Sequence, residues 1–478
     1  MIKTLVAHKE KIFIALLYIA VFLSCIYPYS DYDWGWHLRY GQYFLTHWHL
    51  LRLDPYSWTM PGFPWINHEW LYDPFIYIVF TLTGYIGSSL VGALICLICF
   101  IILIKPYKLK YWHLVIAGFF FSQLVEEGVW QGLRSQVVGY LPQAFLMTLL
   151  VKAKQNTKLL YWLPPLFLVW ANLHGSFAFG LVIVAVFFAY YFFLFPAQRK
   201  TYIWIGLATL VVTLITPFGL GVFHEILKHT NSPYLQDITE WLPIYKTCSY
   251  CNVPTVSVYI VILGIAFFAI GLTESLPFLV IALILVFPAI NERRNFPVFG
   301  LATFPFFLTY LTRLRFDLSR FKLTPLLTIL ILLVTIEYNL VNRLPGFYFY
   351  TYNENDYCYF GPSCSPGLAK FLVAHPPAGH GFNMYDWGGY FIGKQVPAEL
   401  FIDGRMHLWE ASDGYMPFAD LMAFYYSGDM KVFNSYNFSW VAVPPKSGLA
   451  TAIESGKTVG VWRVEYQDNQ SIYFVRAQ

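Results

Sequence analysis

Two aspartates, Asp31 and Asp33, stand two residues apart just after the first apolar run of the chain. Side chains at this spacing point the same way only where the backbone is extended. In that geometry the two carboxylates could hold one divalent cation, Mg²⁺ or Mn²⁺, with phosphate oxygens and water completing the shell. Alternatively, one carboxylate could act as general base toward an acceptor hydroxyl. Asp33 also occupies an expected helix N-cap, so capping and solvation are the competing explanation.

A second acidic position follows about thirty-five residues later, where Asn67 precedes His68 and Glu69. We expect Asn67 to cap a helix that carries Glu69 in its first turn. A carboxylate there is stabilised by the helix dipole, by roughly 0.3–1 kcal/mol. Glu69 is therefore explained either by helix stability or by a role in an acidic site.

Further polar residues stand between later apolar runs. They are Glu126, Glu127 and Arg134; His174 in WANLHGSF; Asp237 and Glu240 in YLQDITEW; and Arg293 and Arg294 in NERRN. The adjacent arginines could bind a lipid phosphate or diphosphate, whose oxygens match a guanidinium bidentately. Headgroup snorkelling or pairing with Glu292 is the alternative. His174 is either a ligand or a hydrogen-bonded packing residue.

The elements that must position these residues are strongly apolar. Of 478 residues, 57% are hydrophobic and 12% are charged, about half the charge of a globular domain, so most of the surface faces something other than water. A bilayer core requires roughly 20 apolar helical residues. Eleven runs are candidate spans, and those near Pro164–Pro165 and Pro277 could be broken or re-entrant. The runs are 11–28, 86–104, 111–126, 136–151, 159–172, 176–195, 201–217, 253–271, 275–290, 296–311 and 324–341.

The basic residues predict how these spans are oriented. Cytoplasmic loops carry an excess of Lys and Arg, and clusters of both fall in alternate segments when the N-terminus is cytoplasmic. They are Lys3, Lys9 and Lys11; Lys105, Lys108 and Lys110; Lys152, Lys154 and Lys158; Arg199 and Lys200; Arg313, Arg315, Arg320 and Lys322. The loop over 29–70 and the residues from about 342 onward are then extracytoplasmic, in an inner or plasma membrane. The first run lacks a small-x-small cleavage site, which favours an uncleaved signal-anchor. The net charge of +4 follows this pattern and indicates no nucleic-acid partner.

Two domains are expected: an all-α polytopic membrane bundle over 1–341, which includes the acidic loop 29–70, and a small α/β domain over 342–478. The second segment is more charged and has no spanning run. Its expected strands are 381–384, 399–404, 439–444, 461–466 and 471–476, and its expected helices are 365–374 and 412–434. A disulfide between Cys358 and Cys364 fits an oxidising compartment, whereas Cys25, Cys96 and Cys99 are expected to pack within spans.

The loop motifs resemble a family of bacterial membrane proteins of the GT-C glycosyltransferase type. That family has the pattern D-x-D-x-W-W-H-L-x-x-G, then D-P-[FY]-S-[WY]-T, then W-x-N-H-E-W-L. This chain reads Asp31-Tyr-Asp33-Trp34-Gly35-Trp36-His37-Leu38…Gly41, then Asp54-Pro-Tyr-Ser-Trp-Thr59, then Trp65-Ile-Asn67-His68-Glu69-Trp70-Leu71. Gly35 departs from the pattern, since the family usually has an aromatic residue there.

The resemblance continues in order along nearly the whole chain. Its later blocks are Arg134-Ser135-Gln136, Trp170-Ala-Asn172-Leu-His174-Gly175, Pro217-Phe-Gly219, Glu240-Trp241, Arg293-Arg294-Asn295, Asp386-Trp-Gly-Gly-Tyr390 and Phe401-Ile-Asp403-Gly404-Arg405. The last two blocks also loosely resemble the acceptor-recognising segment of the oligosaccharyltransferase catalytic subunit. Asp386, Asp403 and Arg405 are therefore candidates for an acceptor region, with turn and loop hydrogen bonding as the alternative.

The resemblance implies a GT-C fold and transfer of a sugar from a polyprenyl-phosphate-type donor to a glycan, lipid or protein acceptor at the outer face. Asp31, Asp33 and Glu69 would then be catalytic, and Arg134, Arg293 and Arg294 would bind the donor phosphate. His37, His68, His174 and Glu240 would support the site. A non-catalytic membrane scaffold is the alternative. A lipid-linked sugar transporter is less favoured, because the spans contain almost no ionisable residues.

Overall fold

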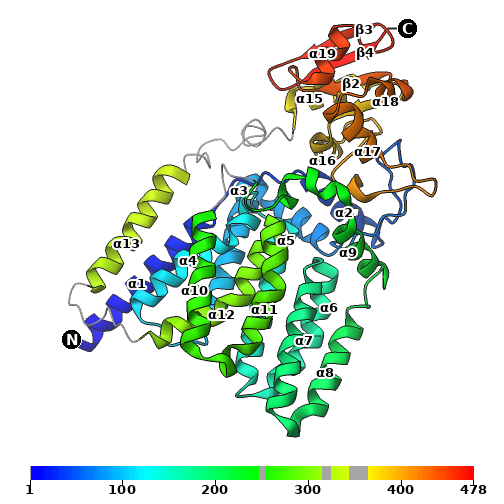
Figure 1. The fold of residues 1–478 in the computed structure, drawn as a ribbon. Helices are drawn as coiled ribbons and strands as arrows, with labels where there is room; N and C mark the ends of the chain where they lie inside the picture. Colours follow the sequence, from blue (N-terminus) through cyan, green and yellow to red (C-terminus); the bar gives the residue numbers. More distant parts are fainter. Residues whose placement is uncertain (1, 247–252, 315–323, 344–363, 478) are drawn as a thin grey trace. The chain divides into compact units, whose positions relative to one another are not determined.

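The computed structural model describes residues 2–246, 253–314, 324–343 and 364–477 (Figure 1). The chain divides into two compact units. We call them the helical unit, comprising Met1–Tyr29, Thr83–Leu220 and Gln236–Thr351, and the mixed unit, comprising Ser30–Leu82, Gly221–Leu235 and Tyr352–Gln478. The acidic loop, which we expected to belong with the membrane bundle, thus groups with the C-terminal residues.

The helical unit is a bundle of long helices that lie side by side in Figure 1. Its helices are α1 (Ile2–Ser24), the part of α3 (Tyr72–Ile104) beyond Leu82, α4 (Tyr111–Val129), α5 (Ser135–Ala153), α6 (Leu163–Leu173), α7 (Phe177–Leu194), α8 (Arg199–Val212), α10 (Val253–Ile270), α11 (Leu272–Asn291), α12 (Phe296–Arg313) and α13 (Thr324–Tyr338). Short turns of 3₁₀ helix are η1 (Thr157–Trp162), η2 (Pro196–Gln198), η4 (Thr239–Trp241) and η5 (Arg293–Asn295), and a π-helical turn, η7, covers Asn339–Arg343.

Helix α12 lies at the centre of this bundle and packs against α4, α5, α10 and α11. Most of its side chains are buried. Polar groups inside the bundle find partners across helices: the amide of Gln143 donates to the carbonyl of Val298 (2.7 Å), and the hydroxyls of Tyr259 and Thr303 lie 3.1 Å apart. Such pairing is required where no water is at hand to satisfy a polar group.

Every one of the eleven predicted spans coincides with a helix of this bundle. Within the described residues, four helices are long and apolar enough to cross a membrane: Tyr72–Ile104, Phe177–Leu194, Glu274–Asn291 and Thr324–Asn342. The exact number of spans stays a prediction. The run over 159–172 is broken, since η1 ends at Trp162 and α6 starts with Pro164 in its first turn, whereas Pro277 lies inside a continuous α11.

The mixed unit combines a small sheet with short helices and the acidic loop. Its helices are α2 (Trp34–His47), the start of α3, α9 (Gly221–Asn231), α15 (Pro366–Ala374), α16 (Tyr385–Gly393), α17 (Pro417–Leu421), α18 (Met430–Ser435) and α19 (Gly448–Glu454), with shorter turns η9 (Met406–Leu408) and η10 (Met422–Tyr426); η3 (Pro233–Asp237) crosses the unit boundary. Its strands are β1 (Gly381–Asn383), β2 (Trp440–Val443), β3 (Trp462–Gln467) and β4 (Ile472–Arg476).

The four strands form one sheet in the order β1-β2-β4-β3. β1 runs parallel to β2, and the other two pairings are antiparallel. Four of the five expected strands are confirmed. The stretch 399–404 is not one of the strands, because its backbone pairs with the acidic loop: the N–H of Leu400 donates to the carbonyl of Tyr56 (2.8 Å), and the N–H of Trp58 donates to the carbonyl of Leu400 (3.1 Å). The expected helix over 412–434 is broken into α17, η10 and α18.

Helix α2 starts directly after Asp33, the residue expected at a helix N-cap, and one of its faces is buried by protein. Trp34 and Leu38 are buried, and α2 packs against α16. The two helices cross at glycines: a Cβ added to Gly35 would overlap the carbonyl oxygen of Gly389, and one added to Gly393 would lie 2.8 Å from Cα of Gly35. The departure at Gly35 thus coincides with a crossing that leaves no room for a side chain.

Candidate active site

The two aspartates of the first motif lie in a turn at the start of α2. Asp31 is buried, and its Oδ1 accepts the backbone N–H of Asp33 (3.3 Å). Asp33 occupies the N-cap position, yet its side chain makes no capping bond; Oδ1 instead accepts the indole N–H of Trp36 (3.0 Å). The backbone of Asp33 is helical (φ −93°, ψ −7°), so the extended geometry that would aim both carboxylates the same way is not present.

A cation held by Asp31 and Asp33 would need further ligands from the chain or the substrate. Among the residues that the structure describes, no group of three or more His, Cys, Asp or Glu side chains is arranged to hold a metal ion. The divalent cation therefore stays a prediction.

Glu69 lies in a turn before α3 rather than in its first turn, because α3 begins only at Tyr72. Asn67 does act locally as expected: its side-chain oxygen accepts the backbone N–H of Glu69 (3.1 Å). The acidic residue in the first turn of α3 is Asp73, which is buried. Asn67 also donates its side-chain N–H to Oδ2 of Asp73 (2.6 Å), so one amide joins the turn of Glu69 to the helix.

His37 stands between these two carboxylates. Its Nδ1 is 2.6 Å from Oδ1 of Asp73, and its Nε2 is 3.7 Å from Oε2 of Glu69. Burial by itself lowers the pKa of His37, but the hydrogen bond to Asp73 and the charges of Asp73, Glu69 and Asp31 outweigh it and raise the pKa above its usual value. Asp31, Glu69 and His37 therefore belong to one charged cluster.

A row of imidazoles continues from this cluster. Nε2 of His68 is 3.6 Å from the second oxygen of Glu69. The ring of His68 contacts that of His229 on α9 (centroids 6.1 Å apart), and Nε2 of His229 lies 3.3 Å from Nε2 of His407. Burial raises the pKa of the nearby Glu225, with the charge of His68 acting against it.

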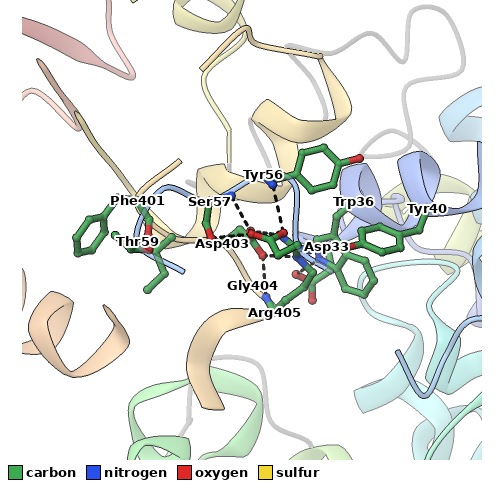
Figure 2. A network of polar contacts seen from close by, with 12 residues as sticks. Asp33, Trp36, Tyr40, Tyr56, Ser57, Thr59, Phe401, Asp403, Gly404 and Arg405 are labelled. Atoms are coloured by element: carbon green, nitrogen blue, oxygen red, sulfur yellow. Dashed lines mark hydrogen bonds and ion pairs between the residues drawn. The ribbon is translucent and has the colours of Figure 1, made fainter. Parts of the chain in front are cut away.

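Arg405 is the centre of a second polar network in the mixed unit (Figure 2). Its guanidinium bonds both oxygens of Asp403 (2.8 and 2.6 Å), Oδ1 of Asp54 (2.9 Å) and the hydroxyl of Tyr40 (2.8 Å). Four aromatic rings surround it: Tyr40, Tyr56, Trp65 and Trp409. The side chains of Arg405, Asp54 and Asp403 have no solvent exposure, so this network joins the acidic loop to the C-terminal chain.

The three residues expected at an acceptor region therefore differ in environment. Asp403 and Arg405 pair with each other in the interior. Asp386, in the first turn of α16, is partly exposed, and no hydrogen bond or ion pair joins its carboxylate to any residue that the structure describes. Burial raises the pKa of Asp386 to about 6.

The three arginines expected to bind phosphate lie in the helical unit, and each pairs with a glutamate. Nε of Arg293 donates to Oε2 of Glu127 (2.8 Å), and Nη1 of Arg294 donates to Oε1 of Glu240 (3.0 Å). Arg134 donates to the other oxygen of Glu240.

Aromatic rings also support two of these arginines. The guanidinium of Arg293 lies over Trp130, and that of Arg294 lies 4.3 Å from the centroid of Trp241. Arg293 is buried, whereas Arg134 and Arg294 are partly exposed and share one carboxylate, that of Glu240. Glu292, the partner expected for them, accepts a hydrogen bond from Asn295, and the charge of Arg294 partly offsets the rise in its pKa that burial causes.

His174 makes local contacts with Ser176 inside the helical unit. Its Nδ1 accepts the backbone N–H of Ser176 (3.1 Å) and lies 2.8 Å from the Ser176 hydroxyl, which also binds the indole of Trp170. Of the cysteines, Cys25, Cys96 and Cys99 are free and buried as expected. Cys364 is disulfide-bonded, but Cys358, Cys248 and Cys251 lie outside the described residues, so the Cys358–Cys364 pairing stays a prediction.

The fold is similar to those of two solved membrane enzymes. The oligosaccharyltransferase of Archaeoglobus fulgidus matches with a TM-score of 0.57 and 12% identity over 90% of this chain and 69% of that one. ArnT of Cupriavidus metallidurans, solved bound to undecaprenyl phosphate, matches with a TM-score of 0.52 and 10% identity over 100% of this chain and 99% of that one. No protein-family model and no curated protein matches the sequence. This chain is a multi-pass membrane protein with a GT-C-like fold.

Two carboxylates of these clusters, Asp73 and Asp54, were not predicted as site residues from the sequence. Asp73 follows Glu69 by four residues and reads as an ordinary N-terminal helix carboxylate. Asp54 was visible only as part of a motif. Both have partners far along the chain, 36 residues away for Asp73 and 351 for Asp54 (405 − 54). One signal was available: both are acidic residues in a segment rich in aromatic residues, where an unpaired carboxylate would be costly.

Proposed function

We propose that this protein is a membrane glycosyltransferase of the GT-C type, which moves a sugar from a polyprenyl-phosphate-type donor to an acceptor on the extracytoplasmic face. The observation that carries the proposal is the cluster of Asp31, Glu69 and Asp73 around His37, held in a chain with a GT-C-like fold. A scaffold would gain nothing from gathering two buried carboxylates and a third, partly exposed one around one imidazole, because burying charge costs stability.

The proposed reaction needs one base and one neutralised leaving group. The acceptor oxygen bonds to the anomeric carbon while the bond from that carbon to the phosphate oxygen breaks, and the electron pair leaves with the polyprenyl phosphate. A carboxylate takes the proton of the acceptor hydroxyl. We assign the role of proton acceptor to Glu69, Asp31 or Asp33. Glu69 is favoured over Asp31 because it is partly exposed, whereas Asp31 is buried, and over Asp33 because it faces the His37 ring.

We assign binding of the donor phosphate to Arg134 and Arg294. Both are partly exposed, and both pair with the same carboxylate, Glu240. A phosphate could therefore replace or join Glu240 as their partner. Arg293 is buried against Glu127 and is assigned to hold the η5 turn in place. A polyprenyl-phosphate donor is consistent with the undecaprenyl phosphate bound in ArnT.

The acceptor is assigned to the surroundings of Asp386, a partly exposed carboxylate without a described partner. Asp403 and Arg405 are buried and pair with each other. We assign them a positioning role, because they flank Gly404 and Oδ1 of Asp33 lies close against that glycine.

Sugar transfer by the purified protein in lipid tests the proposal. Radiolabelled polyprenyl-phosphate sugars are supplied with candidate glycan, lipid and protein acceptors. We expect label transfer by the wild type and a loss of at least about 10²-fold in Asp31→Asn or Asp33→Asn, because general-base or charge-stabilising groups contribute about that much. The control is Asp413→Asn, since Asp413 is exposed and accepts a hydrogen bond from the backbone of its own turn, at the N–H of Tyr415.

Two results would overturn this proposal. If the wild type transfers nothing from any lipid-linked donor, the chain is not a transferase of this kind and a membrane scaffold becomes the leading account. If both Asn variants transfer as well as Asp413→Asn, the first motif serves only to build the turn before α2.

A further inference from the structure

His37 is buried near the start of α2, with its side chain 3% exposed and a carboxylate at each ring nitrogen. Asp73 meets Nδ1 from the first turn of α3, and Glu69 faces Nε2 from the preceding turn. The third charged group near the ring is Asp31, from the segment before α2. The remaining neighbours are aromatic: Trp36 lies against one face of the ring, and Tyr72 meets it edge-on.

This geometry restricts the protonation state of His37. A neutral imidazole donates from one nitrogen and presents a lone pair at the other. If Nδ1–H donates to Asp73, a neutral ring would aim the lone pair of Nε2 at the Glu69 carboxylate. Two electron-rich groups would then face each other at 3.7 Å. A proton on both nitrogens replaces this repulsion with attraction, through a hydrogen bond to Asp73 and an ion pair with Glu69. The raised pKa of His37 agrees with this state.

The contacts around the ring also fix where it points. The 2.6 Å bond to Asp73 holds the ring, and Asn67 holds Asp73 through its second oxygen. Asn67 in turn binds the backbone N–H of Glu69. One closed set of contacts thus connects the backbone and the carboxylate of Glu69 to the same buried pair. Exposure rises outward along it, from 3% for Asp73 and His37 to 12% for Glu69 and 25% for His68.

We propose that His37 is held as an imidazolium by Asp73 and acts as the positioning residue that keeps Glu69 ionised and oriented for proton abstraction. The assignment of Glu69 as the base rests on the proposed function. In the transfer step the acceptor proton moves to Glu69, while His37 keeps both of its protons and contacts no substrate. The proton then leaves Glu69 toward water on the side of His68, whose side chain is the more exposed.

Nitrogen-15 NMR of histidine-labelled full-length protein tests the protonation state without any substrate. The His37 resonances are assigned as those missing from His37→Gln. We expect both ring nitrogens to be protonated at pH 7, with a titration midpoint above that of His47. His47 lies on the same helix but is exposed, and His47→Gln identifies its signals. Asp73→Asn should lower the His37 midpoint by about 1–3 pH units, because the charge and the bond that favour the cation are lost.

A second variant keeps the test decisive if Asp73→Asn does not fold. Glu69→Gln changes a partly exposed residue and should lower the same midpoint, by less than Asp73→Asn does. A neutral His37 at pH 7 in the wild type would overturn the inference. So would a midpoint that neither substitution moves.

The pH profile of sugar transfer tests the functional half. Without the His37 cation, Glu69 should protonate at higher pH, so His37→Gln is expected to shift the acidic limb of kcat/KM upward by about 1–3 pH units. His47→Gln should leave the limb in place. An unchanged limb in His37→Gln would show that His37 does not hold Glu69. If the wild type transfers no sugar at any pH, the proposed function fails, and the NMR experiment still decides the state of His37.

Discussion

At the residue scale, Arg405 and Asp386 represent two kinds of charged side chain in the mixed unit. The buried guanidinium of Arg405 pairs with two carboxylates, donates to a tyrosine hydroxyl and contacts four aromatic rings. No hydrogen bond or ion pair joins the carboxylate of Asp386 to any residue that the structure describes. The first kind of residue holds the fold together. The second reduces stability and is therefore the better candidate for direct contact with a ligand.

Replacing Arg405 should be among the most damaging substitutions in the mixed unit. Arg405→Met leaves Asp54 and Asp403 buried without a counter-charge, so we expect a loss of about 3–5 kcal/mol in the free energy of unfolding. Urea unfolding of the purified protein in detergent measures it. Arg463→Ala is the control, because Arg463 is 71% exposed and pairs with Glu465 at the surface; its effect should stay within about 0.5 kcal/mol. Equal effects of the two variants would contradict the structural role of Arg405.

Asp386 should make stability depend on pH. Folding raises its pKa from 3.8 to about 6, so between these values the folded state binds more protons than the unfolded state. The contribution of Asp386 to stability is therefore greatest below about pH 4 and is lost as pH rises to about 6. Asp386→Asn should flatten this part of the profile and stabilise the protein at pH 7 by roughly 1–3 kcal/mol. The prediction is wrong if the variant keeps the wild-type slope between pH 4 and 6.

At the element scale, the sequence predicted best those helices and strands that are determined by local sequence patterns. Apolar runs of spanning length became helices because a backbone in lipid must satisfy its own hydrogen bonds, and the short β-rich stretches became strands where they pair with each other. It failed where a segment's partner lies far away in sequence. The stretch 399–404 pairs with Tyr56 and Trp58 of the acidic loop instead of the sheet, and no local pattern contains that information. The same limit hid the pairing of Asp54 with Arg405.

The crossing of α2 and α16 is the element contact most sensitive to a single methyl group. Gly35→Ala would place a Cβ against the backbone of Gly389, which has no flexible side chain to move aside. We expect a loss of about 1–3 kcal/mol from overpacking, measured by the same urea unfolding. Gly448→Ala is the matched control, since Gly448 opens helix α19 with nothing within 4 Å of the added Cβ. A Gly35→Ala variant as stable as Gly448→Ala would show that the helices can separate at no cost.

At the scale of the whole molecule, the chain combines a bundle of membrane-type helices with a unit in which the acidic loop and the C-terminal chain fold together. The sequence predicted that the loop groups with the bundle, because in chain order the loop lies between two apolar runs, whereas in the structure the loop groups with the C-terminal chain. The GT-C-like fold is shared with two enzymes at 10–12% identity. At that distance the fold is shown and the chemistry is a proposal, so the reaction itself must be measured.

The most direct measurement of the central claim is the release of polyprenyl phosphate, followed by mass spectrometry, when the purified protein in lipid is given a polyprenyl-phosphate sugar and an acceptor. We predict that the wild type releases the lipid phosphate in amounts equal to the glycosylated acceptor. Glu69→Gln should release at least about 10²-fold less under the same conditions, since the base is missing, whereas Glu465→Gln, at the surface of β3, should match the wild type. Wild-type protein that releases no lipid phosphate, or a Glu69→Gln variant as active as Glu465→Gln, would contradict the account.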